Sequence, residues 1–175
     1  MRSWHDRATE ALEKSIRKFY REVRERVVRA KDLPPLTAGQ IEELLGAPAL
    51  WQEMAQQTFS PTIDRIALAA VRNAGRILGG FSVVELDDPR WLVAAARRTA
   101  QLIRVQLRYR SVIRDRILSA IASGDQSVAT IAEAIDREFK GVIKSSGLTI
   151  ARTETAMIGG QIRDQVFRAE GVEQK

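Results

Sequence analysis

The amino-acid sequence predicts an all-α protein, elongated and built from several long amphipathic helices and short connecting helices. Four long segments repeat apolar residues at steps of three and four, which is the period of one helix face. Proline and glycine fall between these segments, where they end helices. Only the run FSVVEL at 81–86 has a strand-like composition, and a single strand cannot form a sheet.

The first long helix is predicted over residues 4–31. Its apolar positions are Trp4, Ala8, Leu12, Ile16, Phe19, Val23, Val27 and Ala30. Its exposed faces carry acids four residues before bases, as in Glu10–Lys14 and Glu22–Arg26, an order that supports a helix. We interpret this face as self-paired and solvated, because the acids neutralise half of its positive charge. Residues 1–31 are predicted to form an N-terminal helical arm on a helical domain spanning 32–175.

The second stretch begins where Asp32-Leu-Pro-Pro breaks the first helix. Thr37 is then predicted to cap a short helix that ends at Gly46. The next helical stretch covers 48–78, with Ser60-Pro61 expected to kink or restart it and Gly79-Gly80 expected to stop it.

The C-terminal half begins with Asp87-Asp88-Pro89, an acidic cap followed by proline that starts a helix over 89–123. A short helix is predicted from Ser127 through Phe139. A loop then precedes the final helix over 148–170, which ends at Gly171. The loop is expected to contain Gly141, Ser145, Ser146 and Gly147.

The composition limits the chemistry of this chain of 175 residues, a length typical of one domain. It has no cysteine and only one histidine, His5, which excludes thiolate and histidine-cluster metal sites. No window is apolar enough for a membrane span, and no phosphate loop, dinucleotide fingerprint, zinc-protease or nucleophile-elbow motif is present. The carboxylates at Glu42-Glu43 and Asp87-Asp88 are interpreted as helix-start charges. We therefore predict no enzyme, no cofactor, no metal and no catalytic residue.

The net charge of +6 is unevenly distributed. Residues 32–89 carry eight acidic and three basic side chains, whereas residues 90–117 carry eight basic and one acidic. On a helical wheel, Arg90, Arg97, Arg104 and Arg108 align on one face, opposite an apolar face that includes Trp91. Two interpretations stay open: this arginine stripe contacts a polyanion, or it pairs with the acids of 32–89.

The stretch TIARTETAMIGGQIRDQVFRAEGV at 149–172 places Arg-Thr-Glu-Thr in one helical turn. Its apolar stripe is narrow because several members are small, and Gly159 should let a second helix approach closely. Arg152 and Glu154 flank opposite sides of this stripe, so each needs a partner elsewhere. Arg163 lies four residues before Phe167, which would allow the guanidinium to stack on the ring.

This stretch resembles the signature of the phage head-morphogenesis family, the Mu F-like minor head proteins of tailed phages. Residues 150–156, Ile-Ala-Arg-Thr-Glu-Thr-Ala, match without a gap, and Arg163, Phe167 and the closing Gly-Val keep the register. The small helix expected within 124–139 is also similar, so the motif region covers 124–172. Gly160 and Ile162 depart from the family, which usually has Asn and Gly there.

The resemblance implies a structural minor head protein that binds the portal vertex or the inner capsid, and packaged DNA, and acts in head assembly or DNA delivery. It implies portal protein or major capsid protein as partners, a possible homo-oligomer around the portal, no membrane, and a location in the virion after assembly in the host cytoplasm. The expected partner contacts are Arg152, Thr153, Glu154, Thr155 and Arg163. The alternatives are a nucleic-acid-binding helical module of a mobile element and a helical accessory domain of a toxin.

Overall fold

The structure, a computed structural model, describes residues 3–28, 38–79, 88–122, 128–145 and 147–172. These residues form six α-helices and no strand, which confirms the all-α class. The helices are α1 (Trp4–Val28), α2 (Ala38–Leu45), α3 (Pro48–Ile77), α4 (Pro89–Ala122), α5 (Val128–Ser145) and α6 (Gly147–Ala169). The strand-like run 81–86, Thr37 and Ser127 lie outside the described residues.

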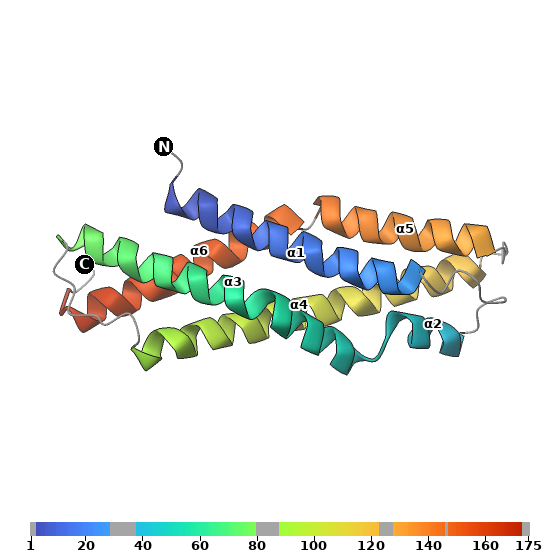
Figure 1. Cartoon of the computed structure of the whole chain (residues 1–175), viewed down its shortest axis with the longest axis horizontal. Coiled ribbons are helices and arrows are strands. Elements are labelled where there is room, and N and C mark those ends of the chain that lie inside the picture. The colour runs from blue at the N-terminus through green and yellow to red at the C-terminus, as the bar shows by residue number, and fades with distance from the viewer. Residues whose placement is uncertain (1–2, 29–37, 80–87, 123–127, 146, 173–175) are drawn as a thin grey trace.

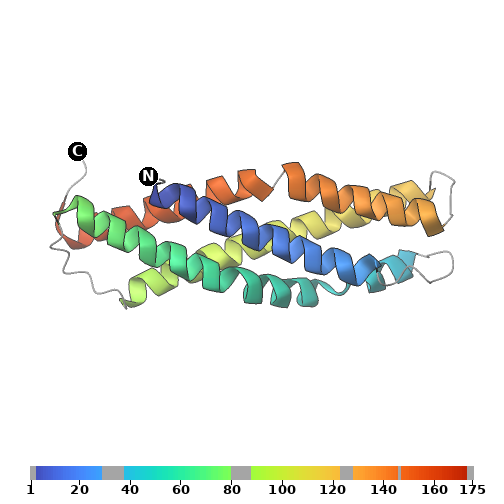
Figure 2. The ribbon, with the colours of Figure 1, turned by 45° about the horizontal axis from the view of Figure 1, so that its top comes forward.

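The helices form an elongated bundle whose members follow its long axis (Figures 1 and 2). α3 and α4 are the two longest helices and pack along each other; α1 packs against α3, α5 and α6, and α3 also contacts α6 directly. The short α2 packs against α4 at one end. No described helix combines the length and apolar character needed to cross a bilayer.

One hydrophobic core joins the long helices. Its aromatic centre is drawn from α1, α3, α4 and α5, and Phe19 of α1 makes ring contacts with Trp51 at 5.5 Å and Phe59 at 5.3 Å between centroids. The Trp51 indole N–H donates to the carbonyl oxygen of Leu45 over 2.6 Å, which ties α3 to the end of α2. Because α1 contributes fully buried side chains to this core, residues 4–28 are part of the bundle, and the predicted separate arm is wrong.

The helix ends follow the sequence signals in most places. Ser3 and Asp6 form reciprocal caps at the start of α1: the Asp6 backbone N–H donates to Ser3 Oγ over 3.1 Å, and the Ser3 N–H donates to Asp6 Oδ2 over 3.1 Å. Gly46, Gly79 and Gly171 have positive φ values of 74°, 87° and 69° and follow the last turns of α2, α3 and α6.

Two predicted breaks do not occur. α3 continues through Pro61, so the helix does not restart at Ser60-Pro61. The Thr62 side chain that follows the proline is buried, and its hydroxyl lies 2.8 Å from Ser15 Oγ of α1. α5 does not end at Phe139 but runs to Ser145, so Gly141 lies inside a helix and the predicted long loop is absent. Phe139 and Val142 explain the extension, because both are buried on the same face of α5.

Candidate functional site

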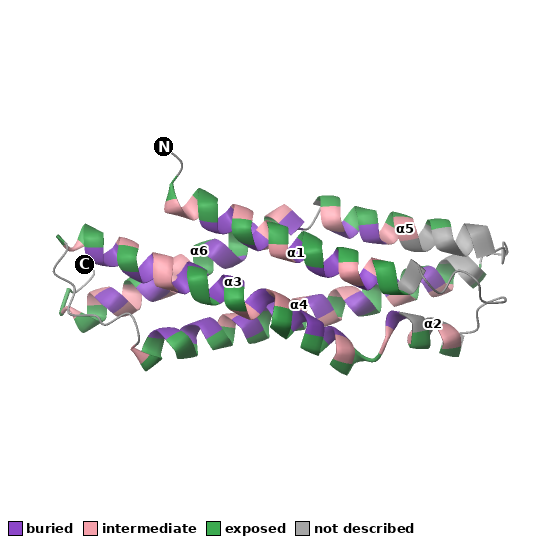
Figure 3. Cartoon of the chain, viewed as in Figure 1, coloured by how far each residue is buried: buried purple, intermediate pink, exposed green. Residues whose placement is uncertain are grey.

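The α4 helix presents two opposite faces, as its sequence predicts. Trp91, Ala95, Leu102 and Ile113 are buried against the bundle, while Arg90, Arg97, Arg104 and Arg108 are all exposed. Figure 3 shows this division along α4, with exposed residues on its outer side.

The first arginine of the stripe is held locally. Its Nε donates to both carboxylate oxygens of Asp88, over 3.0 and 2.9 Å, and its backbone N–H donates to Asp88 Oδ1 over 2.9 Å. These hydrogen bonds from Arg90 hold the pKa of the Asp88 carboxyl below its usual value. Asp88 therefore acts as the cap of α4, and Arg90 belongs to that cap.

The remaining three members, Arg97, Arg104 and Arg108, are called the arginine face below. None of them makes an ion pair or a hydrogen bond with another described residue. At a rise of 1.5 Å per residue they span about 16 Å of the helix surface. The guanidinium groups can therefore reach an external anion without breaking any interaction that the structure describes.

The internal pairing with the acidic segment is made by different arginines, which sequence analysis missed. Arg110, only 5 % exposed, donates from Nε to the carbonyl oxygen of Gly46 over 3.0 Å and from Nη2 to Glu42 Oε2 over 2.5 Å. Arg114 donates from Nη1 to Glu42 Oε1 over 3.0 Å. Pairing between this helix and the acidic segment is thus made by Arg110 and Arg114, outside the stripe, and contact of the arginine face with a polyanion stays a prediction.

Glu42 joins α2 to α4 and is not a helix-start charge as predicted. Hydrogen bonds from Arg110, and then from Arg114, lower the pKa of its carboxyl. A signal for Arg110 existed in the sequence, because at 100° per residue it lies about 60° from the buried Ile113 and at least about 120° from Arg104 and Arg108 on the helix wheel.

The motif on α6 is divided between the core and the surface. Thr155 is fully buried and Glu154 is 7 % exposed, whereas Arg152, Thr153 and Arg163 are exposed. Arg152 and Glu154 were each expected to find a partner elsewhere, in this chain or another; neither makes an ion pair or a hydrogen bond with a described residue, so that expectation stays a prediction. The predicted stacking of Arg163 on the ring of Phe167 is not found among the described residues. Arg163 Nε instead lies 3.8 Å from the carboxylate of Asp164. A guanidinium does lie over a ring at Arg90, which is 5.6 Å from the centroid of Trp91.

Glu154 is the unusual member of the motif. Its Oε2 is buried and has no hydrogen-bond partner among the described residues. Burial raises the pKa of its carboxyl, and the opposing charge of Arg98 on α4 only partly offsets this effect. The Arg98 Nε donates instead to Gln161 Oε1 over 3.0 Å, which links α4 to α6 further along the helix.

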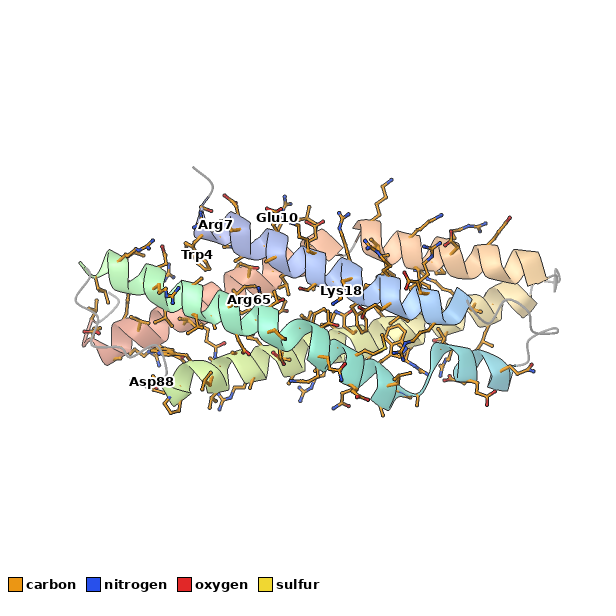
Figure 4. The ribbon with its side chains drawn as sticks, viewed as in Figure 1. Trp4, Arg7, Glu10, Lys18, Arg65 and Asp88 are labelled. Atoms are coloured by element: carbon orange, nitrogen blue, oxygen red, sulfur yellow. The ribbon has the colours of Figure 1, made fainter. Side chains whose placement is uncertain are left out.

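The small residues of α6 allow close packing, as predicted. The indole of Trp4, from the first turn of α1, lies directly over Gly159: a Cβ atom there would stand 2.7 Å from Trp4 Cη2. A Cβ atom on the adjacent Gly160 would meet nothing within 4 Å. In Figure 4 the Trp4 side chain points from α1 toward the neighbouring helices, whereas Arg7 and Glu10 point outward.

No cluster of three or more potential metal ligands exists among the described residues. The chemistry that the site offers is electrostatic: cations on α4 and α6 that are free to bind anionic groups. Comparisons with protein-family models, with curated proteins and with solved structures find no match to this chain.

Proposed function

We propose that this chain is a structural protein of a tailed-phage head that binds packaged DNA through the arginine face and stands at the portal vertex or inner capsid. The observation that carries the proposal is the set of three exposed arginines, Arg97, Arg104 and Arg108, with no partner among the described residues. Guanidinium groups suit phosphate oxygens, and such contacts dominate DNA affinity.

The location in a phage head is supported by the resemblance of residues 150–156 to the head-morphogenesis signature. The helical bundle, with a core continuous from α1 to α6, suits a structural role. The alternative, a nucleic-acid-binding module of a mobile element, is favoured by the same arginine face. Detection of the chain in purified virions separates these two functions, because only the first places it in the head. Its release together with the DNA, or its retention in the emptied head, then shows where in the virion it is bound.

The DNA interaction is tested with a triple variant, Arg97→Gln, Arg104→Gln and Arg108→Gln, measured by duplex binding over a range of salt concentrations. Removing one contact between a guanidinium and a phosphate should flatten the slope of log K against log salt by about 0.9, so removing three should flatten it by about 2.7.

The matched control removes three other cations, Lys14, Arg17 and Lys18, as Gln variants. It changes the net charge equally, but each of these residues already pairs with a glutamate of α1, at 2.9, 2.6 and 3.7 Å. We expect the control to retain most of the affinity. Equal weakening by the two triple variants would show that only net charge matters, and the assignment of the arginine face would be wrong.

A further inference from the structure

The outward side of α6 forms a groove that the proposed function does not use. Arg152 and Arg163 are eleven residues apart, which is about 16 Å along the helix and within about 20° of the same direction around it. Between them lie the exposed Ala156 and the half-exposed Gly160, which leave the surface low. We call these four residues the floor of the α6 groove.

Two hollows extend the floor sideways. One, of about 510 Å³, lies between α1 and α6 and is lined by Thr9, Glu10 and Arg152 among others. The other, of about 270 Å³, lies between the first turn of α1, the last turns of α3, and α6 at Gly159, Gly160 and Arg163. His5 and Ala156 line both hollows, so the two hollows lie next to each other. Each is many times the roughly 30 Å³ occupied by a water molecule, so side chains can enter.

The rim of the groove is partly apolar. Ile77, at the end of α3, lines the second hollow and is 61 % exposed, a large apolar surface for a side chain in a bundle of this kind. Ile77 therefore gives the groove an exposed apolar edge that a side chain of a partner can cover.

The acidic side chains at the edge of the groove have ion-pair partners, whereas the arginines of its floor have few or none. On the α1 edge, Glu10 pairs with Lys14 at 2.9 Å and Glu13 pairs with Arg17 at 2.6 Å. Arg152, by contrast, makes no ion pair or hydrogen bond with any residue that the structure describes, and Arg163 has only Asp164 at 3.8 Å within that same part of the chain. The available charge at both ends of the floor is therefore positive.

A buried polar group also lies in the wall. Thr9 lines the hollow between α1 and α6, is more than nine-tenths buried, and its Oγ1 has no hydrogen-bond partner among the described residues. This oxygen is closed off from the surface of the hollow, so it belongs to the packed wall and is not a contact offered to a ligand.

We propose that the α6 groove binds an acidic amphipathic helix of a protein partner, with two carboxylates about eleven residues apart that pair with Arg152 and Arg163. The small residues between the arginines let the backbone of the partner helix approach closely, and the apolar rim at Ile77 receives its apolar side chains. The proposal does not rest on the DNA-binding function, because it uses none of the arginine face.

A nucleic acid fits this groove less well than a helix. A DNA strand carries a phosphate about every 3.4 Å, so it would bring negative charge against Asp6, Glu10 and Glu13 on the α1 edge. A helix with two well-placed carboxylates meets the arginines at the ends and can avoid those acids.

The test is a selection of displayed helical peptides, about 20 residues long with randomised surface positions, against the full chain. We expect the enriched peptides to carry acidic residues eleven positions apart. Binding of a selected peptide, measured by fluorescence anisotropy, should fall by about tenfold or more in the Arg152→Glu, Arg163→Glu double variant, as expected when paired charges are reversed. It should also fall in Gly160→Leu, which fills the floor but meets no described atom at its Cβ.

The matched control is Arg168→Glu, an exposed arginine on the opposite side of the same helix, which should leave binding unchanged. Circular dichroism checks that each variant stays helical. The proposal is overturned if no helical peptide is enriched, if the enriched peptides are not acidic, or if the control variant weakens binding as much as the double variant. It is also overturned if the double variant weakens duplex DNA binding while peptide binding persists, because the groove would then be a nucleic-acid site.

Discussion

The two adjacent glycines of α6 offer a sharp test of how α1 packs on this helix. Gly159 lies beneath the Trp4 indole, whereas Gly160 faces open space. Alanine at either position adds one methyl group to the same helix, one residue apart. The pair of variants Gly159→Ala and Gly160→Ala therefore separates helix propensity from packing.

The expected magnitudes follow from the two environments. Alanine in place of glycine inside a helix stabilises by about 0.5–1 kcal/mol, and Gly160→Ala should show this gain alone. In Gly159→Ala the new Cβ would stand 2.7 Å from Trp4 Cη2 and 3.1 Å from Cζ2, so the indole must move. Overpacking of this kind costs about 1–3 kcal/mol, so Gly159→Ala should be less stable than Gly160→Ala by that amount.

The measurement is urea unfolding followed by circular dichroism, with acrylamide quenching of tryptophan fluorescence as a second observable. Trp51 and Trp91 are each only 1 % exposed, so added quenching in Gly159→Ala would report displacement of the half-buried Trp4. In a Trp4→Ala background, Gly159→Ala should become as favourable as Gly160→Ala. If Gly159→Ala stabilises the native chain as much as Gly160→Ala does, Trp4 does not pack on α6 as described, and the reasoning is refuted.

Three further outcomes are expected. Glu42→Gln should lower the free energy of unfolding in urea by about 1–3 kcal/mol, because the buried Arg110 is left without its charged acceptor. The control Glu43→Gln, at an exposed position of the same helix, should change little. Equal effects of the two variants would contradict the pairing. Because the pKa of Glu42 is lowered in the folded state, its contribution is present above the unfolded pKa and is lost as pH falls through the folded pKa, so the difference between Glu42→Gln and the wild type should shrink in acid. Glu154 behaves in the opposite sense: burial raises its pKa in the folded state, so wild-type stability falls as the pH rises from the unfolded pKa to the folded pKa. Glu154→Gln should remove that fall in a pH series of unfolding curves. An unchanged pH profile in this variant would contradict the prediction. Arg152→Ala and Arg168→Ala should each leave the free energy of unfolding within about 0.5 kcal/mol, since both side chains are exposed, and a large destabilisation by Arg152→Ala would reveal an internal partner.

The helical class and most helix limits of this protein could be predicted from its sequence. Apolar steps of three and four place one face of each helix in the core, and this local pattern identified Leu12, Ile16, Trp51 and Ile63 as members of that face. The start of α4 at Asp88-Pro89 and the end of α6 before Gly171 also followed, because caps and positive-φ glycines act over a few residues. The exposure of the arginine face followed from the same wheel.

Which charges find partners depends instead on how the helices pack. Arg110 and Glu42 are 68 residues apart, and only the packing of α2 on α4 brings them together, so the wheel could not identify Glu42 as the partner of Arg110. The prediction that the helix restarts at Ser60-Pro61 was wrong because burial of the helix face around the proline outweighs the loss of one backbone hydrogen bond. The contrast between Arg152 and Glu154 has the same origin: both flank the stripe of α6, but α4 and Arg98 lie on the side of Glu154, whereas the side of Arg152 opens into a groove. Local periodicity thus sets which face of a helix is apolar, while the positions of neighbouring helices determine which flank of that face is covered.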